Sequence, residues 1–299
     1  MLIFKLQSYL EAIASDASLY EKGNFEKRSE AIDFIGFGVI DQIDEYLLET
    51  TSPTLLQLRQ HAEKVRSALE ETDQQLFQHI QSNIRQGGYS GTAFKALITK
   101  YVDFNVHDPI SQEEVGYDNL DVLINGLSLF QTMPEQTKDL EPEMVYYQKT
   151  PARIVFELVE KSFIRQEDVF FDIGAGLGQV AILVNLLTGI PTKGIEFEPA
   201  FCDYARDCAA SLNLSDVNFS NVDAREADYS EGTIFFMFTP FHGEILQAVL
   251  EILRQESLQR KIKIITYGPC TAQVALQNWL QAAAPAENNA YKLGIFSSF

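Results

Sequence analysis

Glycines and a carboxylate gather in one short segment, VFFDIGAGLGQV at positions 169–180, that could bind a ligand. A run of apolar residues leads into Asp172, and Gly174, Gly176 and Gly178 follow at every second position. This order predicts a buried strand, a tight turn with positive φ angles, and a helix directly after the last glycine. A nucleotide-like ligand could lie against the bare backbone of such a turn.

The spacing and charge of this turn distinguish between two kinds of ligand. Dinucleotide-binding folds carry G-x-G-x-x-G, whereas the glycines here follow G-x-G-x-G. Asp172 would also repel the diphosphate of a dinucleotide. S-adenosylmethionine has no phosphate and carries an ammonium and a sulfonium group, which a carboxylate attracts. The segment therefore favours S-adenosylmethionine over a nicotinamide cofactor, and a methyltransferase over an oxidoreductase.

Two further acids follow strand-like runs later in the chain. Glu196 ends the run Thr192–Glu196, where a carboxylate can accept hydrogen bonds from both ribose hydroxyls. Asp223 follows the run Val217–Asn221, where it could accept a hydrogen bond from the adenine amino group. Together with Asp172, these acids would follow the cofactor from its amino acid to its sugar and its base. Each acid taken alone could equally be a helix cap in solvent.

Apolar residues in the first part of the chain recur at helical spacing, which predicts an all-helical N-terminal domain over residues 1–140. Its predicted helices include Thr54–Arg85, Ser90–Val102 and Asp118–Phe130. We expect this domain to cover the active site and to select the acceptor, or else to form oligomers.

From residue 141 to residue 299, short β-rich runs alternate with helical ones. The predicted strands are Asp168–Ile173, Thr192–Glu196, Val217–Asn221, Thr233–Phe238, Lys261–Tyr267 and Ala290–Ser298. The predicted helices between them are Gln179–Leu187, Pro199–Leu212, Gly243–Gln255 and Thr271–Ala282. This alternation predicts an α/β fold with a doubly wound, mostly parallel sheet. The end of the chain leaves room for one terminal strand, or for a hairpin whose first arm is poorly formed.

The overall composition narrows the choice of partners. The 299 residues include 42 Asp and Glu against 23 Lys and Arg, a formal net charge of −19. This charge argues against nucleic-acid binding and leaves a protein or a small molecule as acceptor. Three cysteines and four histidines lack the spacing of a metal site, so we expect no metal. Without a signal peptide or an apolar run of about 18 residues, the sequence predicts a cytoplasmic protein with no membrane segment and leaves its oligomeric state open.

The motifs of residues 143–299 resemble those of the class I, or seven-strand, S-adenosylmethionine-dependent methyltransferases. This resemblance implies cofactor binding by Asp172, Gly174, Ala175, Gly176, Gly178, Glu196, Asp223 and Ala224. Within the class, VYYQKT at 145–150, a following helix, and Gln-Val after the last glycine resemble the non-SET histone lysine methyltransferases. That closer resemblance adds Tyr147, Thr150 and Gln179 to the cofactor contacts. Thr150 is also expected to cap a helix that begins at Pro151.

The segment FTPFHG at 238–243 follows the fourth strand, where enzymes of this class face their substrate. Members that methylate amino groups of DNA or glutamine carry Asn or Asp before two prolines and an aromatic residue, and Thr239 replaces that amide or acid here. Thr239 and His242 are the candidate catalytic residues, and Thr239 is also a candidate cofactor contact. His242 could be a general base or could simply pack or face solvent.

A catalytic residue is not required, because the sulfonium already activates the methyl group and positioning supplies most of the rate. The sequence therefore predicts an S-adenosylmethionine-dependent methyltransferase that acts on a protein side chain or a small molecule. The replacement at Thr239 keeps one alternative open, a protein that binds the cofactor without transferring its methyl group and docks a partner.

Overall fold

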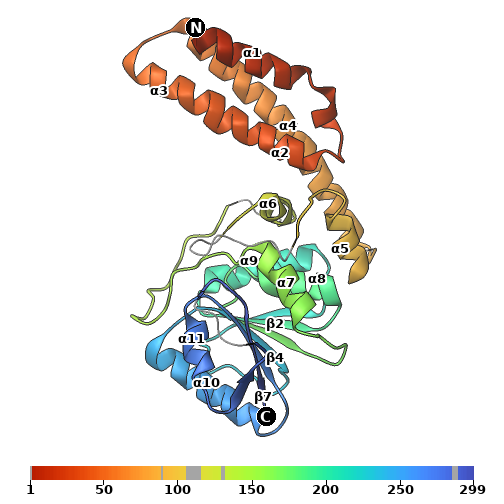
Figure 1. Cartoon of the computed structure of the whole chain (residues 1–299), viewed down its shortest axis with the longest axis vertical. Coiled ribbons are helices and arrows are strands. Elements are labelled where there is room, and N and C mark those ends of the chain that lie inside the picture. Colours follow the sequence, from red (N-terminus) through yellow and green to blue (C-terminus); the bar gives the residue numbers. More distant parts are fainter. Residues whose placement is uncertain (1, 89, 106–115, 129–131, 285–288) are drawn as a thin grey trace.

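The computed structural model describes residues 2–88, 90–105, 116–128, 132–284 and 289–299. An elongated helical arm, residues 2–69, extends from an α/β core (Figure 1). The helices of the N-terminal part are α1 (Leu2–Ser15), η1 (Ala17–Tyr20), α2 (Phe25–Asp33), η2 (Phe34–Ile40), α3 (Asp41–Glu49), α4 (Pro53–Arg85), α5 (Thr92–Ile98) and α6 (Asn119–Gly126). None of the helices in the described ranges is long and apolar enough to cross a membrane.

The core contains one seven-stranded sheet in the order β3-β2-β1-β4-β5-β7-β6. Its strands are β1 (Phe170–Ile173), β2 (Thr192–Glu196), β3 (Val217–Asn221), β4 (Ile234–Phe238), β5 (Lys263–Tyr267), β6 (Leu280–Ala282) and β7 (Gly294–Ser298). Its helices are α7 (Ala152–Lys161), α8 (Gln179–Thr188), α9 (Pro199–Ser211), α10 (Gly243–Ser257) and α11 (Cys270–Ala275). Strands β1 to β5 are parallel, and β7 runs antiparallel to both β5 and β6.

Neighbouring residues of the central strands supply two separate apolar cores, one on each face of the sheet. Phe170 and Phe236 pack with α7, α8 and α9, whereas Phe171 and Phe235 pack with α10. Because successive side chains of a strand point to opposite faces, a strand covered on both faces must be apolar at every position. This requirement explains why β4, with the sequence IFFMF, shows no polar alternation. The predicted α/β fold class and mostly parallel sheet are confirmed.

The C-terminal end of the sheet corrects one predicted helix. The predicted helix Thr271–Ala282 was wrong in its second half, because α11 stops at Ala275 and β6 begins at Leu280. β6 pairs with β7 over three residues, from Leu280 opposite Ser298 to Ala282 opposite Phe296. Hydrogen bonds to a neighbouring strand here outweigh the helical preference of an alanine-rich segment. The structure therefore has the predicted hairpin with a short first arm.

The arm has an apolar core of its own. Residues from α1, η2, α3 and the first half of α4 form this cluster, including Leu10, Ile35, Val39 and Leu69. The second half of α4 instead joins the core on one face of the sheet, through Leu76, Ile80 and Ile84. The long helix predicted at Thr54–Arg85 is thus confirmed, and it connects the two parts of the molecule (Figure 1).

The shorter predicted N-terminal helices are present with reduced bounds. Ser90–Val102 contains α5 and Asp118–Phe130 contains α6, while Phe130 lies outside the described residues. The predicted cap of α7 was wrong. Pro151, not Thr150, occupies the N-cap position, and the N–H of Ala152 donates to the buried carboxylate of Asp121 on α6 at 2.8 Å. The side chain of a proline has no oxygen that could accept from the first N–H groups of the helix, so a carboxylate from another helix stabilises this helix end.

We expect Asp121→Ala to lower the free energy of unfolding by about 1 kcal/mol, since it removes an acceptor from a helix N-terminus. Thr150→Val, which removes only the hydroxyl of the wrongly predicted cap, should cost clearly less. Urea unfolding of the two variants, followed by circular dichroism, measures the difference. A larger loss for Thr150→Val than for Asp121→Ala would restore the sequence-based cap.

Candidate functional site

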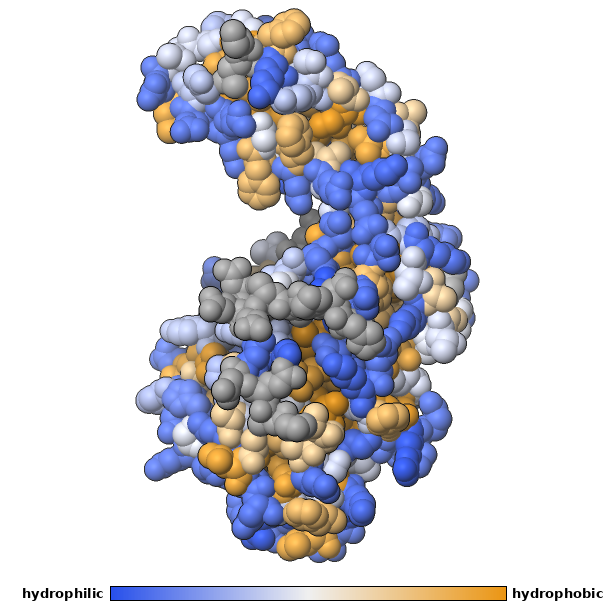
Figure 2. All heavy atoms as spheres, in the orientation of Figure 1, coloured by the Kyte–Doolittle hydropathy of each residue, from blue (hydrophilic) through white to orange (hydrophobic). Residues whose placement is uncertain are grey.

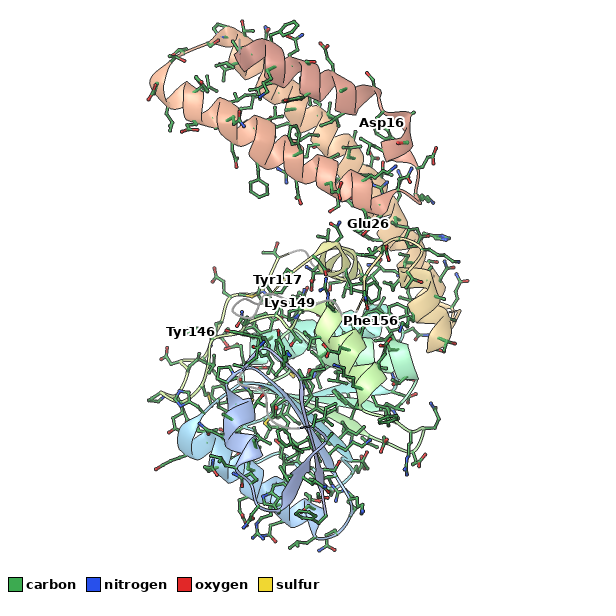
Figure 3. The ribbon with its side chains drawn as sticks, in the orientation of Figure 1. Asp16, Glu26, Tyr117, Tyr146, Lys149 and Phe156 are labelled. Carbon is green, nitrogen blue, oxygen red and sulfur yellow. The ribbon has the colours of Figure 1, made fainter. Side chains whose placement is uncertain are left out.

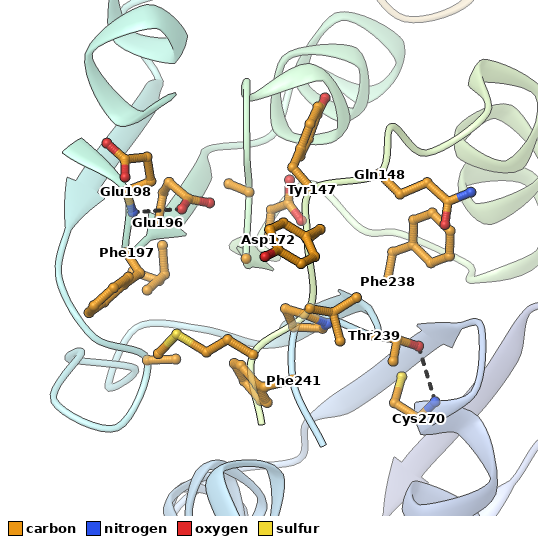
Figure 4. A pocket seen from close by; sticks show the side chains of 18 of the residues that line it. Tyr147, Gln148, Asp172, Glu196, Phe197, Glu198, Phe238, Thr239, Phe241 and Cys270 are labelled. Atoms are coloured by element: carbon orange, nitrogen blue, oxygen red, sulfur yellow. Dashed lines mark hydrogen bonds between the residues drawn. The ribbon is translucent and has the colours of Figure 1, made fainter. Parts of the chain in front are cut away.

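The carboxyl ends of β1 to β5 border a cavity of about 490 Å³. Figure 4 shows the side chains that line it. The sequence-predicted site residues in its lining are Tyr147, Thr150, Asp172, Gly174, Ala175, Gln179, Glu196, Asp223, Ala224, Thr239 and His242. Gly176 and Gly178 are not in the lining. The structure therefore brings together residues from four strand ends and from the segment before α7, separated by up to 95 positions in sequence, from Tyr147 to His242.

Asp172 lies at the end of the central strand β1, in register with Gly194 of β2 and Phe236 of β4. Its side chain is buried, and its Oδ2 atom has no hydrogen-bond partner among the described residues. Burial, together with the nearby charge of Glu196, raises the pKa of Asp172 to about 8. A buried acceptor without a partner is costly unless a ligand supplies the missing donor.

A second buried acceptor lies in the same part of the cavity. Gln179, the first residue of α8, donates from its Nε2 to the carbonyl of Thr150 at 3.0 Å, which fixes the orientation of the amide. Its Oε1 is buried without a partner in the described structure. A cation with several N–H donors, such as the ammonium of an amino acid, would satisfy both Gln179 and Asp172.

Glu196 lies at the end of β2, and backbone groups hold its carboxylate in place. Oε2 accepts from the N–H of Gly176 at 2.6 Å. Oε1 accepts from the N–H of Glu198 at 2.8 Å (Figure 4). Burial is the main cause that raises the pKa of Glu196. Each oxygen keeps a second lone pair for a further donor, so the carboxylate can still bind a pair of vicinal hydroxyls.

In the glycine loop, the position of Gly176 is covered by an aromatic side chain and does not line the cavity. Gly176 has φ +52°, and a Cβ there would collide with the ring of Tyr147, which lies directly over it. Tyr147 also contacts Phe201 of α9, with ring centroids 5.5 Å apart. Burial raises the pKa of the Tyr147 hydroxyl further above neutrality. Glycine is required at this position because an aromatic ring closes over the loop.

Asp223, after β3, is ion-paired in the structure. Its Oδ2 lies 2.6 Å from Nη2 of Arg225, and Oδ1 accepts from Nε of the same residue at 3.0 Å. The Arg225 guanidinium lowers the pKa of the Asp223 carboxyl. Asp223 is therefore a charged residue at the cavity, held in one orientation by its neighbour.

A strap, residues 136–149, crosses the strand ends and forms one wall of the cavity. At one end, the buried carboxylate of Glu198 accepts from the N–H groups of Thr137 (2.9 Å) and Lys138 (2.8 Å) and from the Thr137 hydroxyl (2.6 Å). The Lys138 ammonium donates to the carbonyl of Phe197 at 3.0 Å and lies over the Phe197 ring, 4.1 Å from its centroid. These contacts fix the strap to the β2–α9 turn.

The other contacts of the strap reach β3 and β4. Glu141 pairs with Arg225 at 2.6 Å. Val145 donates its N–H to the carbonyl of Pro240 at 3.0 Å, and Glu143 accepts from the N–H of Ile245 at 2.8 Å. Farther along, Tyr117 donates to the Lys149 carbonyl beneath α6, whereas Tyr146 points outward (Figure 3).

The β4–β5 side of the cavity has a different character. Its lining includes Phe238, Pro269, Cys270, Gln273 and Tyr291, none of which carries a charge at neutral pH. Figure 4 labels Gln148 and Phe238 among the side chains that line the cavity. The cavity thus has an acidic half, bordered by β1, β2 and β3, and an uncharged aromatic half, bordered by β4 and β5.

The two candidate catalytic residues, Thr239 and His242, both lie in the lining of the cavity. Thr239, at φ +40°, donates to the carbonyl of Tyr267 at 3.2 Å and accepts from the N–H of Cys270 at 3.1 Å. Its hydroxyl connects two loops and has no basic neighbour in these bonds. His242 is exposed at the start of α10.

Sequence reasoning missed several lining residues. Phe197 and Phe201 line the cavity, and Phe197 directly follows the end of β2. Glu198 was also missed, although an acid immediately before Pro199 is a signal for a helix N-terminus. Aromatic residues are common in this chain, so only the fold shows which of them reach the cavity.

Comparison with known proteins agrees with this geometry. Residues 141–235 match the family model described as histone methylation protein DOT1. The α/β part of this chain has the seven-stranded fold of the class I S-adenosylmethionine-dependent methyltransferases. The match spans strands β1, β2 and β3, the start of β4 and the second part of the strap. No curated protein matches the chain significantly in sequence.

Several solved structures resemble the methyltransferase part. An RNA methyltransferase from Salinibacter ruber, in complex with S-adenosyl-L-homocysteine, is 21% identical, with a TM-score of 0.39, and the match covers 50% of this chain and 92% of that one. A precorrin-6y C5,15-methyltransferase from Geobacter metallireducens is 16% identical, with a TM-score of 0.40 and coverages of 52% and 91%. Likenesses of this degree say nothing about the substrate.

Proposed function

We propose that this methyltransferase transfers the methyl group of S-adenosylmethionine to a side chain of another protein. The observation that carries the proposal is the division of one cavity into an acidic half and an uncharged aromatic half. The match to a family named for histone methylation supports a protein acceptor. A small-molecule acceptor is the alternative that the assay below separates.

The acidic half fits the cofactor group by group. Asp172 and Gln179 would hold the ammonium, because both present buried acceptors without partners. Glu196 would accept from the two ribose hydroxyls with its remaining lone pairs. Asp223 would accept from the adenine amino group. Thr150 and the loop residues Gly174 and Ala175 would contact the cofactor along its length, as would Ala224 and Thr239.

S-adenosylmethionine, when bound, supplies a methyl group that its sulfonium makes electrophilic. The chain then has to position the acceptor atom in line and exclude water. The strap and the ring of Tyr147 close the cofactor half. On the other half, the rings of Phe238 and Tyr291 would strip water from the acceptor. An ammonium acceptor loses its charge more readily in such apolar surroundings, so no side chain needs to remove its proton in the transfer step.

We further propose that residues 1–140 and 141–299 serve as separate parts, with the helical part selecting the acceptor. We also propose a reducing compartment such as the cytoplasm, since Cys202, Cys208 and Cys270 are buried and unbridged.

The test uses the full chain with S-adenosylmethionine labelled on its methyl carbon. Core histones, a second lysine-rich protein and a small-molecule fraction of a cell extract are offered separately. We expect label in a protein band, and loss of that label in Glu196→Ala but not in Glu226→Gln, which removes an exposed charge outside the cavity. Label in the small-molecule fraction alone would reject the protein acceptor. Tight cofactor binding with no labelled product from any source would favour a binding protein without transfer activity.

A further inference from the structure

The solvent face of the rod formed by α2, η2 and α3 is unusual for an exposed helix. Seven of its exposed positions recur at helical spacing and form a stripe: Lys27, Glu30, Phe34, Phe37, Asp41, Glu45 and Leu48. The opposite face, with Ile35, Val39 and Ile43, is buried in the arm's core. A soluble helix normally carries polar residues all along its solvent face, and this one carries two phenylalanines at its centre.

The exposed apolar side chains of the described residues are concentrated in this arm. Of 17 exposed large hydrophobic residues, eight lie between residues 4 and 56, which is far more than that fifth of the chain would hold by chance. Phe37 is 74% exposed. Phe34 meets Tyr9 of α1 edge to face, with ring centroids 5.5 Å apart, so the aromatic surface continues onto a second helix. Contiguous exposed aromatic surface of this kind marks an interaction site.

The local backbone supports this surface. η2 is a π-helix with the sequence FIGFGVI, and the ring of Phe34 lies against Gly38, where a Cβ would come within 3.0 Å of it. Two glycines inside a helix cost roughly 1 kcal/mol each relative to alanine. π-Helical turns are rare in proteins, and those that occur are frequently found at functional sites. The glycines therefore lower the stability of the helix in the segment where the two phenylalanines are exposed.

The charges around the aromatic rings indicate the kind of partner. Residues 1–56 contain ten Asp and Glu against four Lys and Arg, and one of the four, Arg28, is fully buried. Asp33 and Asp41 lie four residues before and after Phe37. A second copy of this chain would bring these acids against its own, whereas a basic partner would be attracted. Figure 2 shows hydrophilic and hydrophobic residues interleaved on the arm, and Figure 3 shows Asp16 and Glu26 at the end of the arm that is nearer the core.

We propose that this stripe docks a basic amphipathic helix of another protein, with apolar side chains over Phe34 and Phe37 and Lys or Arg beside Asp33 and Asp41. Helices commonly bind helices through apolar residues at positions i, i+3, i+4 and i+7. The arm then recruits a partner at a distance from the methyltransferase cavity. This inference does not depend on the acceptor, because docking is measured without cofactor.

The probe is a fluorescent 18-residue peptide of leucine and lysine, with leucines on one helical face, compared with a scrambled peptide of the same composition. We expect the full chain to bind the amphipathic peptide at least tenfold more tightly than the scrambled one. Phe34→Ala/Phe37→Ala should weaken binding at least tenfold, while Phe163→Ala/Phe299→Ala, which removes two exposed rings outside the arm, should leave it unchanged. Asp33→Asn/Asp41→Asn should reduce both the affinity and its dependence on salt.

Equal binding of the two peptides, or unchanged binding by Phe34→Ala/Phe37→Ala, would overturn the proposal. A wild-type dimer in light scattering that the same double variant converts to a monomer would instead assign the stripe to a second copy of the chain. Cofactor binding should be intact in this variant, so a failure of docking and a failure of the proposed methyl transfer are distinguishable.

Discussion

Asp172→Asn is expected to weaken S-adenosylmethionine binding about 10- to 100-fold at pH 8, and yet to stabilise the cofactor-free protein. The carboxyl group is buried, and its pKa is raised to about 8 by burial and by the charge of Glu196. Asparagine keeps the shape but cannot carry the charge that attracts an ammonium. The same substitution removes a buried acid whose ionised form is unfavourable in the free protein.

The stability effect has a defined pH window. Below about pH 4 the carboxyl is protonated in both the folded and the unfolded chain, so it adds no pH dependence. Between pH 4 and about 8 the unfolded chain ionises while the folded one stays neutral, so the stability of the wild type falls as the pH rises. Thermal unfolding should therefore show that the stability of Asp172→Asn, relative to that of the wild type, increases from pH 4 to pH 8.

The pH dependence of cofactor binding has the opposite sign to that of stability. Below about pH 8 the Asp172 carboxyl must release a proton when the cofactor binds, so wild-type affinity should rise up to about tenfold per pH unit between pH 6 and pH 8. Calorimetry in two buffers of different ionisation enthalpy measures the released proton. Asp172→Asn should lose this pH dependence. An unchanged slope in the variant would show that another group binds the ammonium.

The fold of the second half was largely predictable from sequence, because each strand end coincides with a change of hydrophobic period. β2 and β3 have the predicted bounds, and β1, β4 and β5 differ only at their first residues. β6 was not predictable in this way. Its three residues are partly exposed and carry no alternation, and the edge of β7 selects them for pairing. Short edge strands are specified by their neighbours more than by their own residues.

The site residues at strand ends could be predicted from the sequence. The contacts between segments that lie far apart in the sequence could not. Asp172 and Glu196 follow from the strand–turn pattern alone. The strap does not, because its position depends on Glu198 and Arg225, which lie about 60 and 84 residues away from their partners Thr137 and Glu141. The cap of α7 failed for the same reason, since Asp121 comes from a separate helix. Side-chain hydrogen bonds between remote segments leave no periodic signal in a sequence.

Glu196→Ala is expected to weaken binding of 5′-methylthioadenosine about 100-fold, because it removes two charged hydrogen bonds to ribose at once. This ligand has the ribose and base of the cofactor but no ammonium, so Asp172→Asn should leave its affinity almost unchanged. S-adenosylhomocysteine has both groups and should respond to both substitutions. Glu226→Gln, an exposed acid outside the cavity, controls for the change in net charge.

The same substitution also tests how the glycine loop is held. The Glu196 carboxylate accepts from the N–H of Gly176, so its removal frees the loop over which the Tyr147 ring lies. Glu196→Gln keeps one acceptor oxygen and should recover part of the affinity, whereas a purely electrostatic role would give the same loss in both variants. Isothermal calorimetry of the three ligands with Glu196→Ala, Glu196→Gln and Asp172→Asn separates these cases. Equal losses of 5′-methylthioadenosine binding in Asp172→Asn and Glu196→Ala would contradict the placement of ribose at Glu196 and ammonium at Asp172.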